Sequence, residues 1–298
     1  MYVGILGTGR MGAAIGQRLL DCGHSLCVWN RSGEKTEALR QRGAIAVTTP
    51  AELVTQCELI ISILTDAAAI ESVYGGPAGV LSVPLNGKLF IEMSTVRPDT
   101  QIALDAKITA RGGSKIDCPV GGTVGPARSG KLLGLVGGND TDVLRARPLL
   151  EQLCRRIEHV GPTGAGASLK LAINLPLLVF WQSFGEALSL AAPLHLDPVR
   201  LMDIFADTSG APNLLKLRGA ALAQALTGQK SGDAHFDVDS IRKDMRTMQE
   251  EAHALGYELP VTSAALQCFD RASKAGLGEA DGIQLPVWWL SQTGGAKG

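Results

Sequence analysis

The chain contains 298 residues with a mass of 31.2 kDa, and this length predicts two domains of about 150 residues each. Its 28 Lys and Arg residues nearly balance its 29 Asp and Glu residues, so the net charge of -1 gives no general attraction to nucleic acid or to an anionic membrane. The longest apolar stretches, Leu59–Leu64 and Leu175–Trp181, are far shorter than the ~20 residues of a membrane span, and we expect neither a membrane nor a nucleic acid as partner.

Short β-type runs alternate with helical patterns in the first half of the chain. Strands are expected at Tyr2–Leu6, Ser25–Trp29, Leu59–Leu64, Lys88–Glu92, Lys115–Asp117, Leu132–Val136 and Arg156–His159. Helices are expected at Met11–Cys22, Lys35–Gln41, Arg97–Arg111 and Asp140–Cys154. This alternation predicts an α/β fold with a Rossmann-type, doubly wound and mostly parallel sheet. The first strand has no signal-peptide pattern before it, so a cytoplasmic location is expected.

A glycine-rich loop connects the first expected strand to the first expected helix. It reads Gly7-Thr8-Gly9-Arg10-Met11-Gly12. In this position the G-x-G-x-x-G spacing predicts a dinucleotide site. Gly7 allows a tight turn, Gly9 lets a pyrophosphate approach backbone N–H groups, and Gly12 allows close packing of helix and strand. We expect all six residues to contact the cofactor; the alternative is a glycine turn without a ligand.

The second expected strand ends at Asn30-Arg31-Ser32, which indicates the type of cofactor. An NAD enzyme would have Asp or Glu here to bind the ribose 2′-hydroxyl. A guanidinium at Arg31 suits a 2′-phosphate by charge and geometry, and Ser32 adds a hydroxyl donor. We therefore predict that Asn30, Arg31 and Ser32 bind NADP in preference to NAD, although Glu34 lies close by.

Two further pairs of residues follow strands at the edge of the sheet where ligands collect. Leu64 and Thr65 end one strand and are expected to flank the nucleotide through their backbone. Ser94 and Thr95 follow the next strand, and Ser94 is expected to contact the substrate.

After Gly161 the chain reads almost entirely as helix, which predicts a Rossmann domain at residues 1–162 and an all-helical domain at residues 163–298. Lys170 and Asn174 are four residues apart on the first of these helices, so both side chains are expected to point into the cleft between the domains. An ammonium group can supply a proton where charge develops on a carbonyl oxygen, and an amide can orient the substrate. Trp181 shares this helix face and either lines the substrate pocket or packs in the core.

No metal or disulfide is expected. The five histidines lack metal-ligand spacing, and the six cysteines include no C-x-x-C pair in a chain too large to need disulfides.

Four separated blocks resemble the β-hydroxyacid dehydrogenases related to 3-hydroxyisobutyrate dehydrogenase, within the 6-phosphogluconate dehydrogenase superfamily. They are GILGTGRMG from Gly4, DCPVGGTVGPARSGKL from Asp117, G-x2-G-x-G-x3-K-x3-N from Gly161, and KDM from Lys243. The resemblance covers essentially the whole chain. It implies that Lys170 is the general acid/base, that Thr95 contacts the cofactor and Lys243 reaches over it, and that the helical domain forms a homodimer or a higher homo-oligomer.

The substrate loop departs from the pattern D-A-P-V-S-G-G that is common in this family. Here Gly121 replaces the serine, and a hydroxyl appears at Thr123. We expect Gly121, Gly122 and Thr123 to hold the anionic group of the substrate. The change either suits a bulkier anion bound by successive N–H groups or is neutral within a carboxylate site. The segment from Thr208 to Asn213 also fails to match the serine-containing segment of many 3-hydroxyisobutyrate dehydrogenases.

These observations predict an NADP-dependent oxidoreductase that interconverts a small anionic oxo compound and its hydroxy form by hydride transfer. One alternative is a phosphonate- or sulfonate-specific ketone or aldehyde reductase, for example with a substrate like 2-oxopropylphosphonate. An imine reductase is a second, against which Lys170 counts because enzymes of that type usually lack the lysine. The third is a non-catalytic NADP-binding interaction module. The sequence leaves four properties open: the anionic group of the substrate, the physiological direction of the reaction, its stereochemistry, and whether the oligomer is a dimer or a tetramer.

Overall fold

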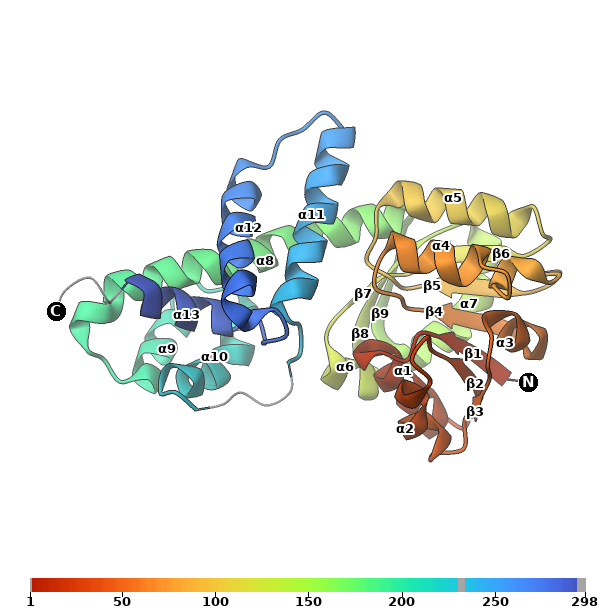
Figure 1. Ribbon diagram of the computed structural model, residues 1–298, viewed down its shortest axis with the longest axis horizontal. Coiled ribbons are helices and arrows are strands. Elements are labelled where there is room, and N and C mark those ends of the chain that lie inside the picture. The colour runs from red at the N-terminus through yellow and green to blue at the C-terminus, as the bar shows by residue number, and fades with distance from the viewer. Residues whose placement is uncertain (1, 230–233, 294–298) are drawn as a thin grey trace. The chain divides into compact units, whose positions relative to one another are not determined.

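The computed structural model describes residues 2–229 and 234–293. The chain divides into two compact units, Met1–Leu171 and Ala172–Gly298 (Figure 1). The first unit contains a sheet with helices on both faces, and the second is built from helices. This confirms the predicted fold class.

The first unit is organised around a nine-stranded sheet. Its strands are β1 (Tyr2–Leu6), β2 (Ser25–Trp29), β3 (Ile45–Ala46), β4 (Cys57–Ser62), β5 (Leu89–Glu92), β6 (Ser114–Asp117), β7 (Val120–Gly121), β8 (Leu132–Gly137) and β9 (Cys154–Gly161). Their order is β3-β2-β1-β4-β5-β6-β8-β7, and β9 pairs with β8. The first six strands pair in parallel in the order of a doubly wound Rossmann sheet. Strand β8 runs antiparallel to β6 and β7 and parallel to β9.

Helices cover both faces of this sheet. They are α1 (Arg10–Asp21), α2 (Glu37–Arg40), α3 (Pro50–Gln56), α4 (Ala67–Gly75), α5 (Pro98–Thr109), α6 (Val124–Arg128) and α7 (Asp140–Leu153), with short 3₁₀ turns at Gly33–Thr36 and Val80–Ser82. Apolar residues of α1, α2, α6 and α7 form one buried cluster with the strands, and those of α3, α4 and α5 form a second cluster. Figure 1 shows α4 and α5 on the same side of the sheet. The apolar faces of the strands are therefore buried on both sides, as a parallel sheet requires.

Within its described residues, the second unit is helical apart from one isolated β-bridge between Asp237 and Asp281. Helix α8 (Ala165–Ala191) begins in the first unit and continues into the second, where a 3₁₀ turn (Ala192–Leu194) follows it. The other elements are α9 (Pro198–Ala206), α10 (Asn213–Leu226), α11 (Val238–Ala254), α12 (Pro260–Ala272), a π-helical turn (Ser273–Leu277) and α13 (Gln284–Thr293). Asp197 caps α9 by accepting the N–H of Arg200 at 3.0 Å.

The segment Ala165–Leu194 is long and apolar enough to cross a membrane by length and composition. The expectation that no segment reaches this length was wrong, because the helix joins shorter apolar stretches across polar residues such as Lys170 and Asn174. In the structure 44% of its most apolar window is buried, and the core helix of a soluble protein passes the same test.

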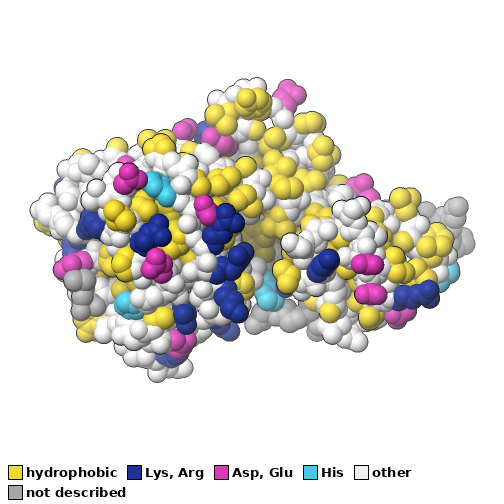
Figure 2. Space-filling view, turned by 180° about the vertical axis from the view of Figure 1, so that it is seen from behind, with side chains coloured by type: hydrophobic (Ala, Val, Ile, Leu, Met, Phe, Trp, Pro, Cys, Tyr) yellow, Lys and Arg dark blue, Asp and Glu magenta, His cyan; other side chains and the backbone are white. Residues whose placement is uncertain are grey.

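Figure 2 shows hydrophobic side chains gathered where the end of α11 and the start of α12 are connected, at the top of the view. Large apolar residues in the connection between these helices and at its borders are 64–70% exposed: Leu255, Tyr257 and Val261. This end of the helix pair therefore presents an apolar surface to solvent, in contrast to its charged flank.

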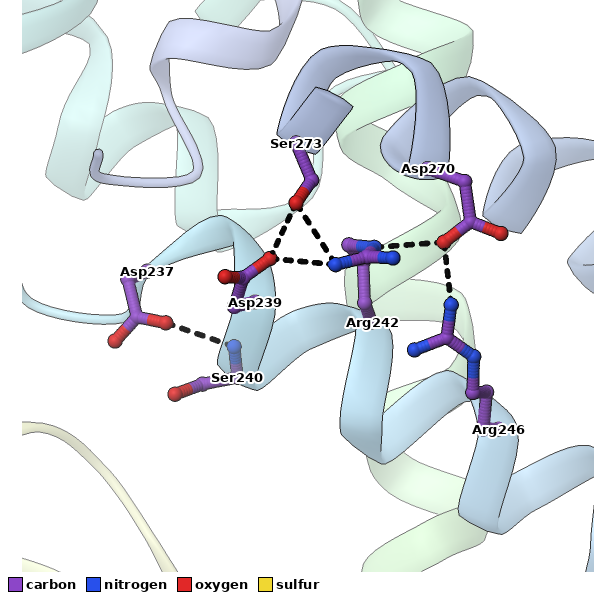
Figure 3. Close-up of polar contacts among 7 residues, drawn as sticks. All are labelled: Asp237, Asp239, Ser240, Arg242, Arg246, Asp270 and Ser273. Carbon is purple, nitrogen blue, oxygen red and sulfur yellow. Dashed lines mark hydrogen bonds and ion pairs between the residues drawn. The ribbon is translucent and has the colours of Figure 1, made fainter. Parts of the chain in front are cut away.

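Ion pairs on that flank join α11 to the end of α12 (Figure 3). Arg242 donates to Asp239 at 2.6 Å and to Asp270 at 2.6 Å, and Arg246 also contacts Asp270 at 2.5 Å. The Ser273 hydroxyl donates to Asp239 at 2.7 Å. The hydrogen bond from Ser273, followed by those from Arg242, lowers the pKa of Asp239 from its ordinary value of 3.8.

A lowered pKa makes Asp239 a source of stability that depends on pH. Its contribution is present above the unfolded pKa of 3.8 and is lost as the pH falls through the lower folded value. Exposed pairs contribute about 0.2–1 kcal/mol, which corresponds to a shift of about 0.5–4 °C in Tm for a chain of this size. We expect Asp239→Asn to lower Tm by that amount at pH 6, and the difference from the wild type to shrink as the pH falls below 3.8 and through the lower folded pKa. Asp203→Asn, at an exposed position of α9, is the control. A Tm loss for Asp239→Asn that is equal at pH 6 and below pH 3.8 would contradict the expectation.

Candidate active site

The glycine-rich loop connects β1 to α1 at the carboxyl end of the sheet, as predicted. Gly7 has φ +96° and donates its N–H to the carbonyl of Trp29 at 2.9 Å. A Cβ atom at Gly12 would lie 1.9 Å from the carbonyl oxygen of Gly7, whereas a Cβ atom at Gly9 would meet nothing within 4 Å. Packing therefore requires glycine at position 12, and position 9 faces open space at the start of α1.

The start of α1 has the properties of an anion site. Gly9 is the N-cap and provides no side-chain cap, and the first turn contains no acidic residue. The hydroxyl of Thr8 is buried and has no hydrogen-bond partner among the described residues. The N–H groups of a first turn cannot bond within the helix, so they and Thr8 fit the pyrophosphate of a dinucleotide. Arg10 and Met11, the first two residues of α1, flank this open position.

Asn30 holds the glycine-rich loop in place. Its Oδ1 accepts the N–H of Thr8 at 3.0 Å, and its Nδ2 donates to the carbonyl of Ser32 at 3.0 Å. Both bonds lie within the first unit and link the ends of β1 and β2. The amide is thus a brace for the loop, and its predicted contact with the cofactor stays a prediction.

Arg31 extends from the end of β2 and is exposed. No hydrogen bond or ion pair of its guanidinium with another described residue is found. Ser32 precedes the 3₁₀ turn, and its side chain makes no capping bond there. The cation at Arg31 is therefore available to an anionic ligand.

A buried polar network links the ends of β4 and β5. The hydroxyl of Ser94 accepts the N–H of Leu64 at 2.7 Å, and the N–H of Ser94 donates to Glu92 at 2.8 Å. The hydroxyl of Ser62 contacts both Glu92 and the hydroxyl of Tyr74, the latter at 2.7 Å. Burial raises the pKa of Glu92.

This network buries the Ser94 hydroxyl, which accepts a hydrogen bond from the backbone N–H of Leu64. Thr65, next to Leu64, is exposed, and Thr95 is half-buried. The predicted roles of these residues at the nucleotide and the substrate stay predictions.

The predicted anion loop lies between β6 and α6. Gly121 belongs to β7 and pairs with Leu133 of β8. Gly122 has φ +123°, a conformation that favours glycine. Thr123 is exposed, and its hydroxyl makes no capping bond to α6. The structure thus brings the three residues together in one loop with exposed backbone.

Helix α8 carries the predicted catalytic pair, one turn apart. Lys170 is 9% exposed and Asn174 is 5% exposed, so both groups are largely removed from bulk water. The first turn of α8 is held by Asp117, which accepts the N–H of Gly164 at 2.7 Å and that of Ala167 at 3.0 Å.

A residue that the sequence did not single out connects two predicted site residues in the second unit. Asp244 is 3% exposed. Its Oδ2 accepts from the amide of Asn174 at 3.5 Å, and its Oδ1 contacts the ammonium of Lys243. The only available signal was its place beside Lys243 in the KDM block.

Trp181 is 5% exposed and packs beside Phe180, with ring centroids 5.7 Å apart. This placement agrees with the core-packing alternative, and its contact with the substrate stays a prediction. Within the described residues, no group of three or more His, Cys, Asp or Glu could hold a metal ion.

Comparison with known proteins gives two adjoining family matches. Residues 2–161 match the NAD binding domain of 6-phosphogluconate dehydrogenase. Residues 164–286 match a family described as NAD-binding of NADP-dependent 3-hydroxyisobutyrate dehydrogenase. The chain also resembles glyoxylate/succinic semialdehyde reductase 1 of Arabidopsis thaliana, with 34% identity over 94% of this chain and 96% of the relative.

Two further proteins are similar over nearly their whole length. The 3-hydroxyisobutyrate dehydrogenase of Pseudomonas aeruginosa is 31% identical, covering 92% of each chain. The solved structure "Psf3 in complex with NADP+ and 2-OPP" is 27% identical with a TM-score of 0.85, covering 98% of this chain and 99% of the other.

Proposed function

Because this chain belongs to the β-hydroxyacid dehydrogenase family related to 3-hydroxyisobutyrate dehydrogenase and is an NAD(P)-dependent oxidoreductase of CH–OH groups, we propose that it uses NADP(H) to interconvert a small anionic oxo compound and its hydroxy form. The observation that carries the proposal is the buried pair Lys170 and Asn174, one turn apart on α8. A buried ammonium and a buried amide on one helix face are suited to a carbonyl oxygen that gains charge.

The glycine-rich loop and Arg31 would hold the cofactor, which supplies or accepts a hydride when bound. Lys170 donates a proton from Nζ to the carbonyl oxygen during reduction and takes it back from the hydroxyl during oxidation. The amide of Asn174 donates to Asp244, and it lies one turn from Lys170 on α8, where an amide would orient the substrate oxygen. Asp244 thereby fixes which way the amide donates.

Two observations support NADP over NAD. The exposed Arg31 follows β2 where an NAD enzyme has an acidic residue, and a relative with 27% identity was solved with NADP+. A guanidinium binds a phosphate by two parallel N–H bonds. The 2′-phosphate of NADP would provide that group.

The names of the relatives support a small oxo acid as substrate. One acts on glyoxylate and succinic semialdehyde, another on 3-hydroxyisobutyrate. The second candidate, a phosphonate or sulfonate substrate, is favoured by Gly121, which replaces the family's serine and leaves more room for a larger anion beside the exposed Gly122 and Thr123.

The test is the initial rate of NADPH oxidation with matched small oxo compounds that carry a carboxylate, a sulfonate or a phosphonate. We expect turnover with at least one class, and the class with the highest kcat/KM identifies the anion. Absence of turnover with all three, from protein that binds NADPH, would support the non-catalytic interaction module instead.

Restoring the family's serine is expected to change this preference. A Cβ atom at Gly121 would meet Leu133 at 3.5 Å, an ordinary contact, so Gly121→Ser fits. One hydrogen bond to a charged group contributes about 1.5–3 kcal/mol, so kcat/KM for the carboxylate should rise about tenfold or more relative to the phosphonate. Gly125→Ser, where a Cβ atom meets nothing within 4 Å, is the control. An equal change in all three classes would show that Gly121 does not select the anion.

A homo-oligomer is also part of the proposal. Large apolar side chains remain exposed on the second unit, including Leu190 at 85%, Val199 at 66% and Leu217 at 81%. Contact with a second copy of the chain would remove this apolar surface from water.

A further inference from the structure

Asp117 is a fully buried carboxylate that ends β6 and reaches the start of α8. Its Oδ1 accepts the N–H of Gly164 at 2.7 Å, and its Oδ2 accepts the N–H of Ala167 at 3.0 Å. These donors cannot bond within the helix, and the residue that satisfies them lies 47 and 50 positions earlier in the chain. One side chain therefore anchors the first turn of α8 to the end of a central strand.

Two glycines bring their backbone directly against this carboxylate. A Cβ atom at Gly137 would lie 2.7 Å from Asp117 Oδ1, and one at Gly166 would lie 2.8 Å from Oδ2. The Gly166 Cβ atom would also lie 2.3 Å from the carbonyl oxygen of Leu135. The anchor thus allows little movement of α8 relative to β8.

The main chain of Asp117 leads directly into the anion loop. The N–H of Cys118 donates to the carbonyl of Glu92 at 2.7 Å, and the N–H of Leu135 donates to the carbonyl of Pro119 at 3.1 Å. Gly121 follows two residues after Pro119. Asp117 is therefore attached to both parts of the site. Its main chain continues into the anion loop, and its side chain holds the start of α8.

A buried cation faces this carboxylate. Lys115 lies two residues earlier on β6, is 2% exposed, and has no hydrogen-bond partner for its ammonium among the described residues. Its charge acts on Asp117, Glu92 and Asp105. Burial raises the pKa of Asp117, while Lys115 and the two N–H donors oppose that rise. These groups favour the ionised carboxylate, which accepts with both oxygens.

We propose that Asp117 is a positioning residue that holds Lys170 and the anion loop in a fixed spatial relation. Lys170 lies three residues after Ala167, on the same side of α8 as the anchored N–H group. The role of Lys170 as proton donor rests on the proposed function. Displacement of a catalytic group by about 1 Å can lower the rate about 100-fold. An anchor three residues before Lys170 can therefore control catalysis without touching the substrate.

The matched comparison is Asp117→Asn against Glu92→Gln. Glu92 is the register partner of Asp117 on β5 and is equally buried. It bonds to Ser94 and Ser62 instead of α8. In Asp117→Asn, the amide oxygen can still accept one backbone N–H, but the NH₂ group faces the other N–H donor and that hydrogen bond is lost. Glu92→Gln instead disturbs the ends of β4 and β5. Both changes neutralise one buried carboxylate with almost no change in volume.

Three quantities are measured on the full chain: kcat and substrate KM, the NADPH Kd, and amide exchange of the segment 162–171. Asp117→Asn is expected to lower kcat about 100-fold, to keep the NADPH Kd within about twofold, and to speed exchange in that segment. Glu92→Gln is expected to raise the NADPH Kd and leave exchange in the segment unchanged.

The outcomes separate this inference from the proposed function. Wild-type protein that reduces none of the oxo compounds contradicts the function, and exchange in the segment then decides alone whether Asp117 anchors α8. If the wild type is active and Asp117→Asn keeps its kcat, or loses NADPH affinity as much as kcat, the positioning role is wrong. Asp117→Ser is the second variant; if neither folds, Asp117 is a folding residue and the inference is overturned.

Discussion

Replacing Lys170 with alanine is expected to lower kcat by about 10²–10⁴-fold, the range that general acid–base groups contribute. The buried ammonium on α8 is the proton donor in the proposed reaction, and alanine leaves the substrate oxygen without it. The glycine-rich loop does not include Lys170, so the NADPH Kd should stay within about threefold. The measurement is kcat at saturating NADPH with the best substrate, beside the NADPH Kd from fluorescence titration.

The control for this variant is Lys216→Ala, which removes an exposed lysine of α10. It should keep the wild-type kcat. A Lys170→Ala protein that is folded, binds NADPH and retains more than about a tenth of the wild-type kcat would remove Lys170 from the chemistry, because acid–base groups account for at least about 10²-fold.

Changing Arg31 to aspartate is expected to weaken NADPH binding by about 10–100-fold. Hydrogen bonds to a charged group contribute about 1.5–3 kcal/mol, and aspartate would also repel the 2′-phosphate. NADH lacks that phosphate, so its Kd should stay the same or fall, since aspartate can accept from the 2′-hydroxyl. The quantity to compare is the ratio of the two Kd values in wild type and variant, at low and physiological salt.

Lys35→Asp makes the same change of charge four residues later, within the 3₁₀ turn. It controls for the general field of the surface. If both variants weaken NADPH binding equally, Arg31 acts only through net charge. If Arg31→Asp leaves the NADPH Kd unchanged, the predicted preference for NADP is wrong.

The parts of the fold that were predicted well are those whose sequence pattern is local. Strands β1 and β2 have the predicted bounds, because buried β-branched and apolar residues lie between a glycine turn and polar residues. Two helices were missed although signals existed. Thr49 caps α3 by accepting from Glu52 at 3.1 Å, and Asp66 caps α4 by accepting from Ala69 at 2.7 Å.

Two short elements had no local signal. Strand β7 is two residues long and exists through its pairing with Gly134 and Leu133. Helix α6 contains Gly125 and Pro126 within five residues, a composition that disfavours a helix unless the tertiary structure holds it. Strand β7 depends on pairing with the neighbouring strand β8, and α6 depends on packing in the buried cluster that it shares with α1.

The candidate site divides in the same way. The glycine-rich loop, Lys170 and Asn174 follow from spacing within one segment. The buried carboxylates Asp117 and Asp244 take their roles from partners 47 to 70 residues away. A single sequence does not reveal such partners, because an aspartate that anchors a helix and one on the surface look alike.

Gly9 and Gly12 carry different kinds of information about related sequences. At position 12 even a methyl group would overlap the carbonyl of Gly7, at 1.9 Å, whereas at position 9 it would enter empty space. A descendant that no longer bound a dinucleotide would still have to keep the third glycine in order to fold, but it could accept larger side chains at the second. Loss of Gly9 with Gly12 retained would thus mark a chain that has kept this architecture after abandoning its ligand.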